Sequence, residues 1–220
     1  MSRMQKSYVR KEAFRDAKLL YIAVEGIYTE KIYFEQLAKK YRNPKTKLII
    51  IPRKSTDSSP SHIMHNLIMQ LTNYDDVIAD NVYLVIDRDK WKHKMLTNVE
   101  KECFQKKYTF IVSNPCFELW LLLHKDDVSV YSREEKNKVK ENKRNSRAKN
   151  AKKYLEKILS DRIGGYNKTS EVSIIKFIPT VKTAVANAEK LNPPLPSERG
   201  WPETLCTQVH IVAQKIIDPG

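Results

Sequence analysis

Hydrophobic and polar positions along the first half of the chain alternate between two periods. Short apolar runs that end at a glycine, a proline or a polar residue are typical of strands buried on both faces; they cover residues 18–26, 47–52, 81–89 and 108–114. Each run is followed by a segment with apolar residues at helical spacing; these segments cover residues 29–41, 58–71, 96–107 and 115–124. Strands that alternate with helices in this way predict an α/β fold, in which a mostly parallel sheet has helices on both faces.

The starts of these helices carry signals of their own. Thr29 is expected to cap the first helix, because its hydroxyl can accept a hydrogen bond from a free backbone N–H. Pro60 and Pro115 are expected in the first turns of the second and fourth helices. Proline is tolerated there because the missing N–H has no partner within the helix.

The second half of the chain differs in composition. Residues 132–157 are polar, and between Lys136 and Lys153 nine basic residues accompany one acid, Glu141. The chain continues with a glycine-containing turn at 163–170, a helix at 180–191, a proline-rich connector at 192–202 and a last helix at 203–217. The sequence therefore predicts an α/β domain over residues 15–127 and a basic helical extension over residues 128–220 that packs on it.

The chain carries a strong positive charge. Its 220 residues include 40 Lys and Arg against 26 Asp and Glu, which gives a formal net charge of +14. Such a surplus attracts polyanions, so nucleic acid is the first partner to consider. The alternative is a well-solvated basic surface without a ligand.

Cysteine usage and hydropathy indicate a compartment. Cys103, Cys116 and Cys206 lie far apart, without the paired spacing of a zinc site or a disulfide framework, which fits a reducing environment. The first residues are charged and lack the apolar core of a secretory signal, and no apolar run is long enough to span a bilayer. We therefore expect a soluble cytoplasmic protein without a membrane partner, and the sequence leaves its oligomeric state open.

Acidic residues follow two of the predicted strands. Glu25 ends the first strand, and Asp87 and Asp89 end the third, where alternate residues point to the same side. The carboxyl ends of parallel strands meet at one edge of a sheet, which is where ligands bind. If the two strands are neighbours, three carboxylates converge, and a divalent cation is the usual means of neutralising them. Mg²⁺ or Mn²⁺ held in this way suits phosphodiester chemistry.

Two further acids are candidates for the same site. Glu30 lies in the first turn of the first helix, and Glu118 lies among apolar residues where an unpaired carboxylate is costly. Ordinary structural roles also exist: Glu25 as a solvated strand end, the two aspartates as loop residues, and Glu30 as a partner of the helix dipole. The occurrence of these acids at the ends of successive elements favours a metal site over the separate explanations.

Several motifs together resemble a known family. The stretches "VEGIYTEKIYF" (24–34) and "VIDRD" (85–89) resemble the glutamate and DxD motifs of the Toprim domain, which topoisomerases, bacterial primases and OLD-type nucleases share. They occur with "SNPCFELWLLLH", "GYNK", "AVANAEKL" and "TLCTQVHIVAQKI" in the order seen in RloB-like proteins. The resemblance covers residues 19–217, and "SNPCFELWLLLH" is its most specific part.

The resemblance implies a Toprim-like, Rossmann-like fold that carries a metal site. By it, Glu25 takes the place of the Toprim glutamate and Asp87 and Asp89 the metal-binding pair, so these three are the expected catalytic residues. Glu25 either binds metal or carries the proton. Two ions of Mg²⁺ or Mn²⁺ are expected, with ligands drawn from Glu25, Glu30, Asp87, Asp89 and Glu118.

Basic residues are expected to place a nucleic-acid backbone through its phosphates, with binding that weakens steeply in salt. By the resemblance, Tyr166 and Lys168 match a Tyr-x-Lys pattern and are expected to contact a phosphate, with packing and surface exposure as alternatives. The expected nucleic-acid contacts are Lys90, Lys140, Lys143, Arg144, Arg147 and Lys168.

RloB-like proteins are encoded beside restriction–modification and phage-defence genes, often next to an AAA/ABC-type ATPase. The resemblance therefore implies a metal-dependent endonuclease that acts on DNA or RNA in anti-phage or restriction-associated defence. The alternative is a non-catalytic nucleic-acid-binding or regulatory subunit that works only with a partner ATPase. The chain has no GxxxxGK[ST] phosphate loop, so ATP hydrolysis by this chain alone is not expected. Its small size and the lack of a catalytic-tyrosine domain or zinc module argue against a topoisomerase or primase.

Overall fold

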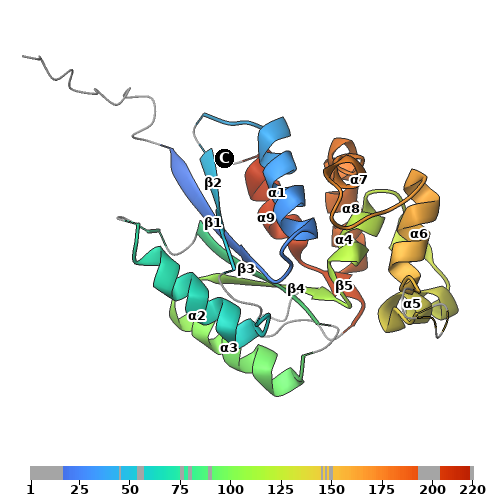
Figure 1. The fold of residues 1–220 in the computed structure, drawn as a ribbon, viewed down its shortest axis with the longest axis horizontal. Coiled ribbons are helices and arrows are strands. Elements are labelled where there is room, and N and C mark those ends of the chain that lie inside the picture. Colours follow the sequence, from blue (N-terminus) through green and yellow to red (C-terminus); the bar gives the residue numbers. More distant parts are fainter. Residues whose placement is uncertain are drawn as a thin grey trace, which may run out of the picture.

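The chain folds around a mixed sheet. The computed structural model describes residues 17–44, 46–53, 57–74, 77–78, 81–88, 91–144, 146, 148, 151–192 and 204–218. The sheet has the strand order β2–β1–β3–β4–β5 (Figure 1), with β1 at Lys18–Val24, β2 at Thr46–Ile51, β3 at Val82–Asp87, β4 at Thr109–Asn114 and β5 at Cys206–Thr207. Strands β1 to β4 pair in parallel, and β5 is antiparallel to β4. The predicted α/β fold with a mostly parallel sheet is confirmed.

The register of the central strands decides where the acidic residues lie. β1 and β3 are neighbours, with Tyr21 paired to Val82 and Val24 paired to Val85. The backbone N–H of Glu25 donates to the Val85 carbonyl at 3.2 Å. The end of β1 therefore lies beside the end of β3, as the convergence of their acids requires.

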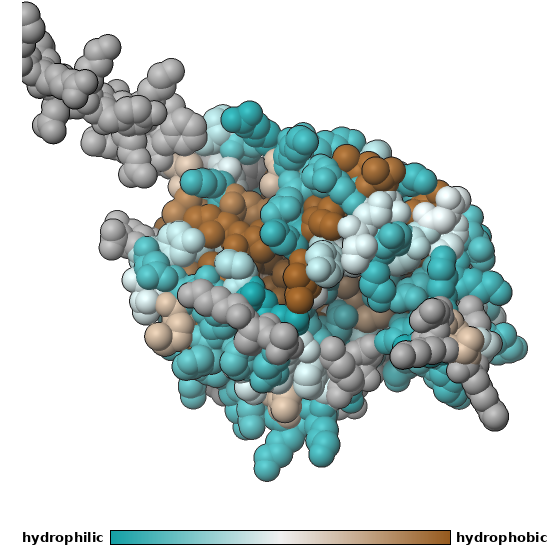
Figure 2. Space-filling view, in the orientation of Figure 1, coloured by the Kyte–Doolittle hydropathy of each residue, from teal (hydrophilic) through white to brown (hydrophobic). Residues whose placement is uncertain are grey.

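Alternate residues of each strand feed two hydrophobic cores, because successive side chains of a strand point to opposite faces. In β1, Tyr21 and Ala23 belong to one core, and Leu20 and Ile22 belong to the other. The first face is covered by α2 (Pro60–Leu71) and α3 (His93–Gln105), and the second by α1 (Thr29–Lys40), α4 (Phe117–Leu123), α8 (Val181–Leu191) and α9 (Val209–Ile217) (Figure 1). In the same orientation, hydrophilic side chains cover most of the surface around an apolar area (Figure 2). Within the described ranges, no helix combines the length and the apolar character needed to cross a membrane.

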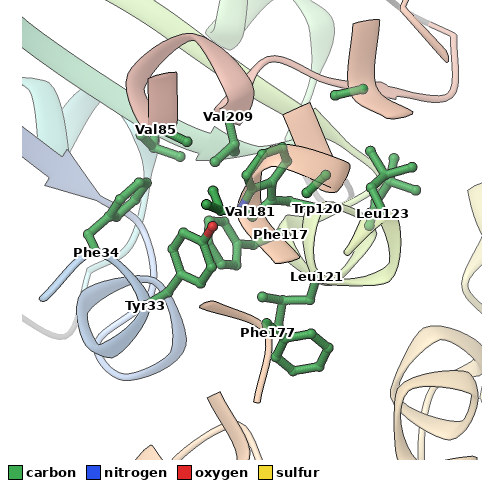
Figure 3. Close-up of a cluster of buried hydrophobic side chains, with 14 of the residues drawn as sticks. Tyr33, Phe34, Val85, Phe117, Trp120, Leu121, Leu123, Phe177, Val181 and Val209 are labelled. Carbon is green, nitrogen blue, oxygen red and sulfur yellow. The ribbon is translucent and has the colours of Figure 1, made fainter. Parts of the chain in front are cut away.

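Aromatic side chains fill the centre of the larger core (Figure 3). The ring of Tyr33 makes edge contacts with Phe117 and Trp120 at centroid distances of 5.5 and 6.2 Å. Its hydroxyl is hydrogen-bonded to Nε2 of His124 at 3.0 Å. Burial lowers the pKa of His124 to about 3, so the ring is neutral in this contact. These contacts fix α1 against α4, and each of these helices carries one of the predicted acids.

The second half of the chain contributes to the same core. Leu159 and Val212 belong to the same buried cluster as Leu20 and Phe117, so apolar packing runs across the predicted boundary between residues 127 and 128. The remaining elements of this half are α5 (Arg133–Glu141), α6 (Tyr154–Ile163), α7 (Glu171–Ile175) and two 3₁₀ turns at Val128–Val130 and Ile178–Thr180.

Two local expectations about helix starts differ from the structure. Thr29 is the first residue of α1 rather than its cap, and its hydroxyl donates to the carbonyl of Lys168 at 2.9 Å. Pro60 does begin α2, as predicted, whereas α4 begins at Phe117, two residues after Pro115.

The last helix is shorter than predicted. It begins at Val209, because Gln208 and the two residues before it pair with β4: the Gln208 N–H donates to the Val112 carbonyl at 3.1 Å. On the outer side, Asn192 holds Thr207 through two hydrogen bonds to its backbone, at 2.8 and 3.1 Å, as a neighbouring strand would. The predicted proline-rich connector lies outside the described residues except for Asn192.

A shared core predicts a single unfolding transition for the chain. Leu159→Ala, in the second half, is expected to lower the free energy of unfolding by about 2–5 kcal/mol, because it leaves a cavity in the common cluster. Urea unfolding followed by tryptophan fluorescence and by far-ultraviolet circular dichroism measures this, with the exposed Lys157→Ala as the control. Two separate transitions, of which the variant shifts only one, would contradict the prediction.

Candidate metal centre

A cavity of about 400 Å³ opens where the parallel strands end. Four of the five predicted metal ligands line it, namely Glu25, Glu30, Asp87 and Glu118. The fifth, Asp89, lies outside the described residues, as do the predicted nucleic-acid contacts Lys90 and Arg147. The strand ends therefore bring the described acids together, as the parallel register requires.

Glu25 is held against the end of β3. It is 5 % exposed, and its Oε2 accepts hydrogen bonds from the backbone N–H of Asp87 at 3.2 Å and from the indole N–H of Trp91 at 3.0 Å. Its backbone carbonyl accepts from the Arg53 guanidinium at 3.0 Å. These contacts fix the carboxylate at the junction of β1, β2 and β3.

Gly26 makes room for the Glu30 carboxylate. The Gly26 N–H donates to Oε1 of Glu30 at 3.0 Å. A Cβ atom on residue 26 would lie 1.9 Å from Oε2 of Glu30, far inside van der Waals contact. The glycine after the first strand is therefore explained by the close approach of a carboxylate.

Glu30 is the most perturbed acid of the cavity. Burial, together with the negative charges of Glu118 and Glu25, raises the pKa of Glu30 from 4.5 to about 7, against the opposing effect of hydrogen bonds from backbone N–H groups. The cluster therefore holds a proton near neutral pH. Binding of a cation at these carboxylates releases such a proton, which makes affinity depend on pH.

Asp87 and Glu118 approach each other across the turn that precedes α4. Oδ1 of Asp87 accepts from the Phe117 N–H at 2.8 Å. One oxygen of Asp87, one oxygen of Glu118 and the sulfur of Cys116 all lie within 4.8 Å of one another. This donor set fits a divalent cation, since two carboxylates and a thiol can converge on one point. Cys116 was not predicted as part of the site, because a lone cysteine carries no metal-binding spacing.

Lys168 lies at the acidic centre. Its Nζ is 3.5 Å from Glu118 and 2.5 Å from Glu156, and its carbonyl is tied to Thr29 at the start of α1. Partial burial opposes the charge, but Glu118 and Glu156 together raise the pKa of Lys168 above its usual value. Of the predicted basic contacts that the structure describes, Lys168 is the one that lines the cavity.

The other predicted basic contacts lie outside the cavity lining. Lys140, Lys143 and Arg144 are exposed around the end of α5, where Lys143 pairs with Glu141 at 3.0 Å. Two further cations line the cavity: Lys153, which ends the basic segment identified from the sequence, and Arg53, which sequence reasoning missed. Arg53 had a usable signal, because it follows the end of β2 at the same edge of the sheet.

Comparison with known proteins places these residues within one family. The family model described as RloB-like protein matches residues 20–216, which span most of the chain. The chain belongs to the RloB-like protein family. All described acids and cations that line the cavity of this RloB-like chain fall within the matched range. No curated protein and no solved structure matches the chain.

The raised pKa of Glu30 predicts a pH dependence of stability for the metal-free RloB-like protein. Between pH 4.5 and about pH 7, Glu30 carries a proton in the folded state that it lacks in the unfolded state. The free energy of unfolding therefore falls as the pH rises through this window and then levels off. Glu30→Gln should remove roughly 2–3 kcal/mol of this dependence, as measured by urea unfolding in EDTA at several pH values. The exposed Glu35→Gln, on the same helix, is the control and should keep the wild-type slope. Equal slopes for wild type and Glu30→Gln would contradict the prediction.

Proposed function

We propose that this RloB-like protein is a metal-dependent nuclease that hydrolyses phosphodiester bonds in DNA or RNA. The observation that carries the proposal is the convergence of Asp87 and Glu118 with Glu25 and Glu30 in one cavity. Acids that hold a divalent cation, next to cations that hold phosphates, are the groups that this hydrolysis needs.

The acidic residues divide the proposed work. Asp87 and Glu118 would hold a Mg²⁺ or Mn²⁺ ion, and a second ion would draw on Glu25, Glu30 and Asp89. Such an ion would act as a Lewis acid and make water a stronger nucleophile. Of Glu25 and Glu30, the carboxylate that does not hold an ion would accept a proton from the attacking water.

The basic residues at the cavity bind the substrate. Arg53, Lys153 and Lys168 line the same space as the acids, so they are placed to contact phosphate oxygens next to the scissile bond. Lys140 and Arg144 are exposed outside it, where they would contact the backbone further along the polymer. Binding through such contacts is expected to fall steeply with salt.

The biological setting is proposed from the family. Because RloB-like proteins are encoded beside phage-defence and restriction–modification genes, we propose that cleavage serves defence. The family's frequent neighbour is an AAA/ABC-type ATPase, so we propose such a partner; ATP hydrolysis would belong to it, since this chain has no GxxxxGK[ST] motif.

One contact favours a second candidate function. Lys168 pairs with Glu118, which neutralises part of the acidic cluster without a metal ion. A non-catalytic, nucleic-acid-binding or regulatory subunit that works only with a partner ATPase would have such a site. It differs from the nuclease in that the pure protein would bind no divalent cation and cleave nothing.

Cleavage by the purified protein tests the leading proposal. Plasmid DNA, single-stranded DNA and total RNA are incubated with Mg²⁺, Mn²⁺ or EDTA. Asp87→Asn and Glu118→Gln are expected to lower the cleavage rate by about 100-fold or more, which corresponds to about 3 kcal/mol of transition-state stabilisation. Both changes keep the shape of the side chain, and Asn at position 87 can still accept from the Phe117 N–H.

The control is Glu189→Gln, an exposed acid on α8, which should leave cleavage unchanged. Cleavage that survives EDTA, or that both site variants retain in full, would contradict the metal-dependent nuclease. Absence of cleavage together with absence of divalent-cation binding would favour the non-catalytic subunit.

Lys168 is predicted to have opposite effects on cation and substrate. Because its ammonium lies 3.5 Å from a Glu118 oxygen, Lys168→Met should tighten Mn²⁺ binding by about 10-fold, or roughly 1.4 kcal/mol, and weaken nucleic-acid binding. Calorimetry measures the first effect and fluorescence anisotropy with a labelled oligonucleotide measures the second. The exposed Lys140→Met serves as the control for Mn²⁺ binding. Weaker Mn²⁺ binding by Lys168→Met would show that the lysine supports the site instead of competing with the ion.

A further inference from the structure

Cys116 gives the acidic centre a donor that an oxygen-only magnesium site lacks. Its sulfur lies within 4.8 Å of both an Asp87 oxygen and a Glu118 oxygen. The residue is 4 % exposed and lines the same cavity as the two acids. A buried cysteine is often only a small apolar residue, so its surroundings must decide between packing and ligation.

Asn142 holds the sulfur through a hydrogen bond. Its Oδ1 accepts from the Leu155 N–H at 3.0 Å, so the NH₂ group is the part of the amide that faces Cys116, and Nδ2 donates to the sulfur at 3.3 Å. Asn142 itself ends α5 in the left-handed conformation, with φ of 41°, and is 6 % exposed. A fixed donor behind a metal-binding atom is the usual means of orienting a ligand and of stabilising its charged form.

Tyr166 lies close to the same centre. It is 6 % exposed, and its hydroxyl lies next to the Thr29 side chain without a hydrogen bond of good geometry among the described residues. Burial and the charges of Glu118 and Glu30 raise the pKa of Tyr166, which places its hydroxyl in the field of the acidic centre and of Cys116. Tyr166 therefore lies near Glu118 and Cys116 but outside the cavity lining.

The other two cysteines have different surroundings. Cys103 contacts the sulfur of Met64 at 3.8 Å in the core below α2 and α3, and Cys206 lies in β5. Burial raises the pKa of each thiol to about 12. Among the described residues, Cys116 lies within a group of side chains that could bind a metal ion, whereas Cys103 and Cys206 do not.

We infer that Cys116 is a metal ligand and that Asp87, Cys116 and Glu118 select a thiophilic divalent ion, such as Zn²⁺, Co²⁺ or Fe²⁺, over Mg²⁺. Thiolate sulfur binds these ions far better than it binds Mg²⁺, which prefers oxygen. On binding, the metal–sulfur bond forms, the thiol proton passes to solvent and a water leaves the ion. The inference rests on the metal centre of the proposed function and changes the identity of its ion.

Cobalt provides a readout that does not depend on cleavage, because a Co²⁺–thiolate bond gives a near-ultraviolet charge-transfer band. The full-length protein, reduced and free of metal, is titrated with Co²⁺ while absorption is recorded. The band is expected in wild type, Cys103→Ser and Cys206→Ser, and is expected to disappear in Cys116→Ser. Zn²⁺ should displace Co²⁺ at concentrations about 100-fold lower than Mg²⁺ does. Cys116→Ser should weaken Zn²⁺ binding by about 10-fold or more and leave Mg²⁺ binding unchanged.

A band that persists in Cys116→Ser, or calorimetric binding of Co²⁺ to wild type without any band, would overturn the inference. Cys116→Ala serves as a second variant, and circular dichroism confirms that both variants are folded. Loss of the band in both folded variants supports ligation, whatever the cleavage assay shows. Magnesium-dependent cleavage without a cobalt band would support the proposed nuclease and contradict ligation by Cys116. A Cys116-dependent band without cleavage in the presence of any metal would support ligation by Cys116 and contradict the proposed nuclease.

Discussion

Repulsion between carboxylates at the end of a parallel sheet is the constraint on which this site depends. Glu25, Glu30, Asp87 and Glu118 line one cavity, and each is held by a specific group. Backbone and indole N–H groups bind Glu25, the Gly26 N–H binds Glu30, the Phe117 N–H binds Asp87 and the Lys168 ammonium pairs with Glu118. The raised pKa of Glu30 shows that these contacts do not fully offset burial and like charge. A divalent cation would complete the neutralisation.

The fold explains why both halves of the chain are needed for this cluster. The first half delivers acids at the ends of β1 and β3 and on α1 and α4, and the aromatic core around Tyr33 and Trp120 fixes those two helices against each other. The second half supplies Lys168 beside Glu118 and Asn142 behind Cys116. The site therefore lies between the two sequence regions, and the continuous core between them keeps its geometry.

Much of this arrangement follows from local pattern. Glu25 and Asp87 could be placed from sequence because each ends an apolar run, and the parallel pairing of two such runs leaves their ends side by side. The positions of Cys116 and Lys168 could not be predicted in the same way, since their place in the cavity results from contacts between distant segments. β5 covers two residues, Cys206 and Thr207, and is defined by pairing with β4 and by the Asn192 side chain, which leaves no periodic signal. The basic segment from Lys136 to Lys153 was evident from its charge, but charge did not indicate which members reach the site: Lys153 lines the cavity, whereas Lys140 and Arg144 lie outside it.

The central claim is that this acidic cluster holds a divalent cation, and a crystal structure of the protein soaked in Mn²⁺ tests it most directly. Anomalous scattering locates manganese independently of any activity. The account predicts a peak in the cavity, with carboxylate oxygens of Asp87 and Glu118 at about 2.0–2.4 Å and the Lys168 ammonium displaced from Glu118. A cavity without an anomalous peak at saturating Mn²⁺, with Lys168 still paired to Glu118, would contradict the account.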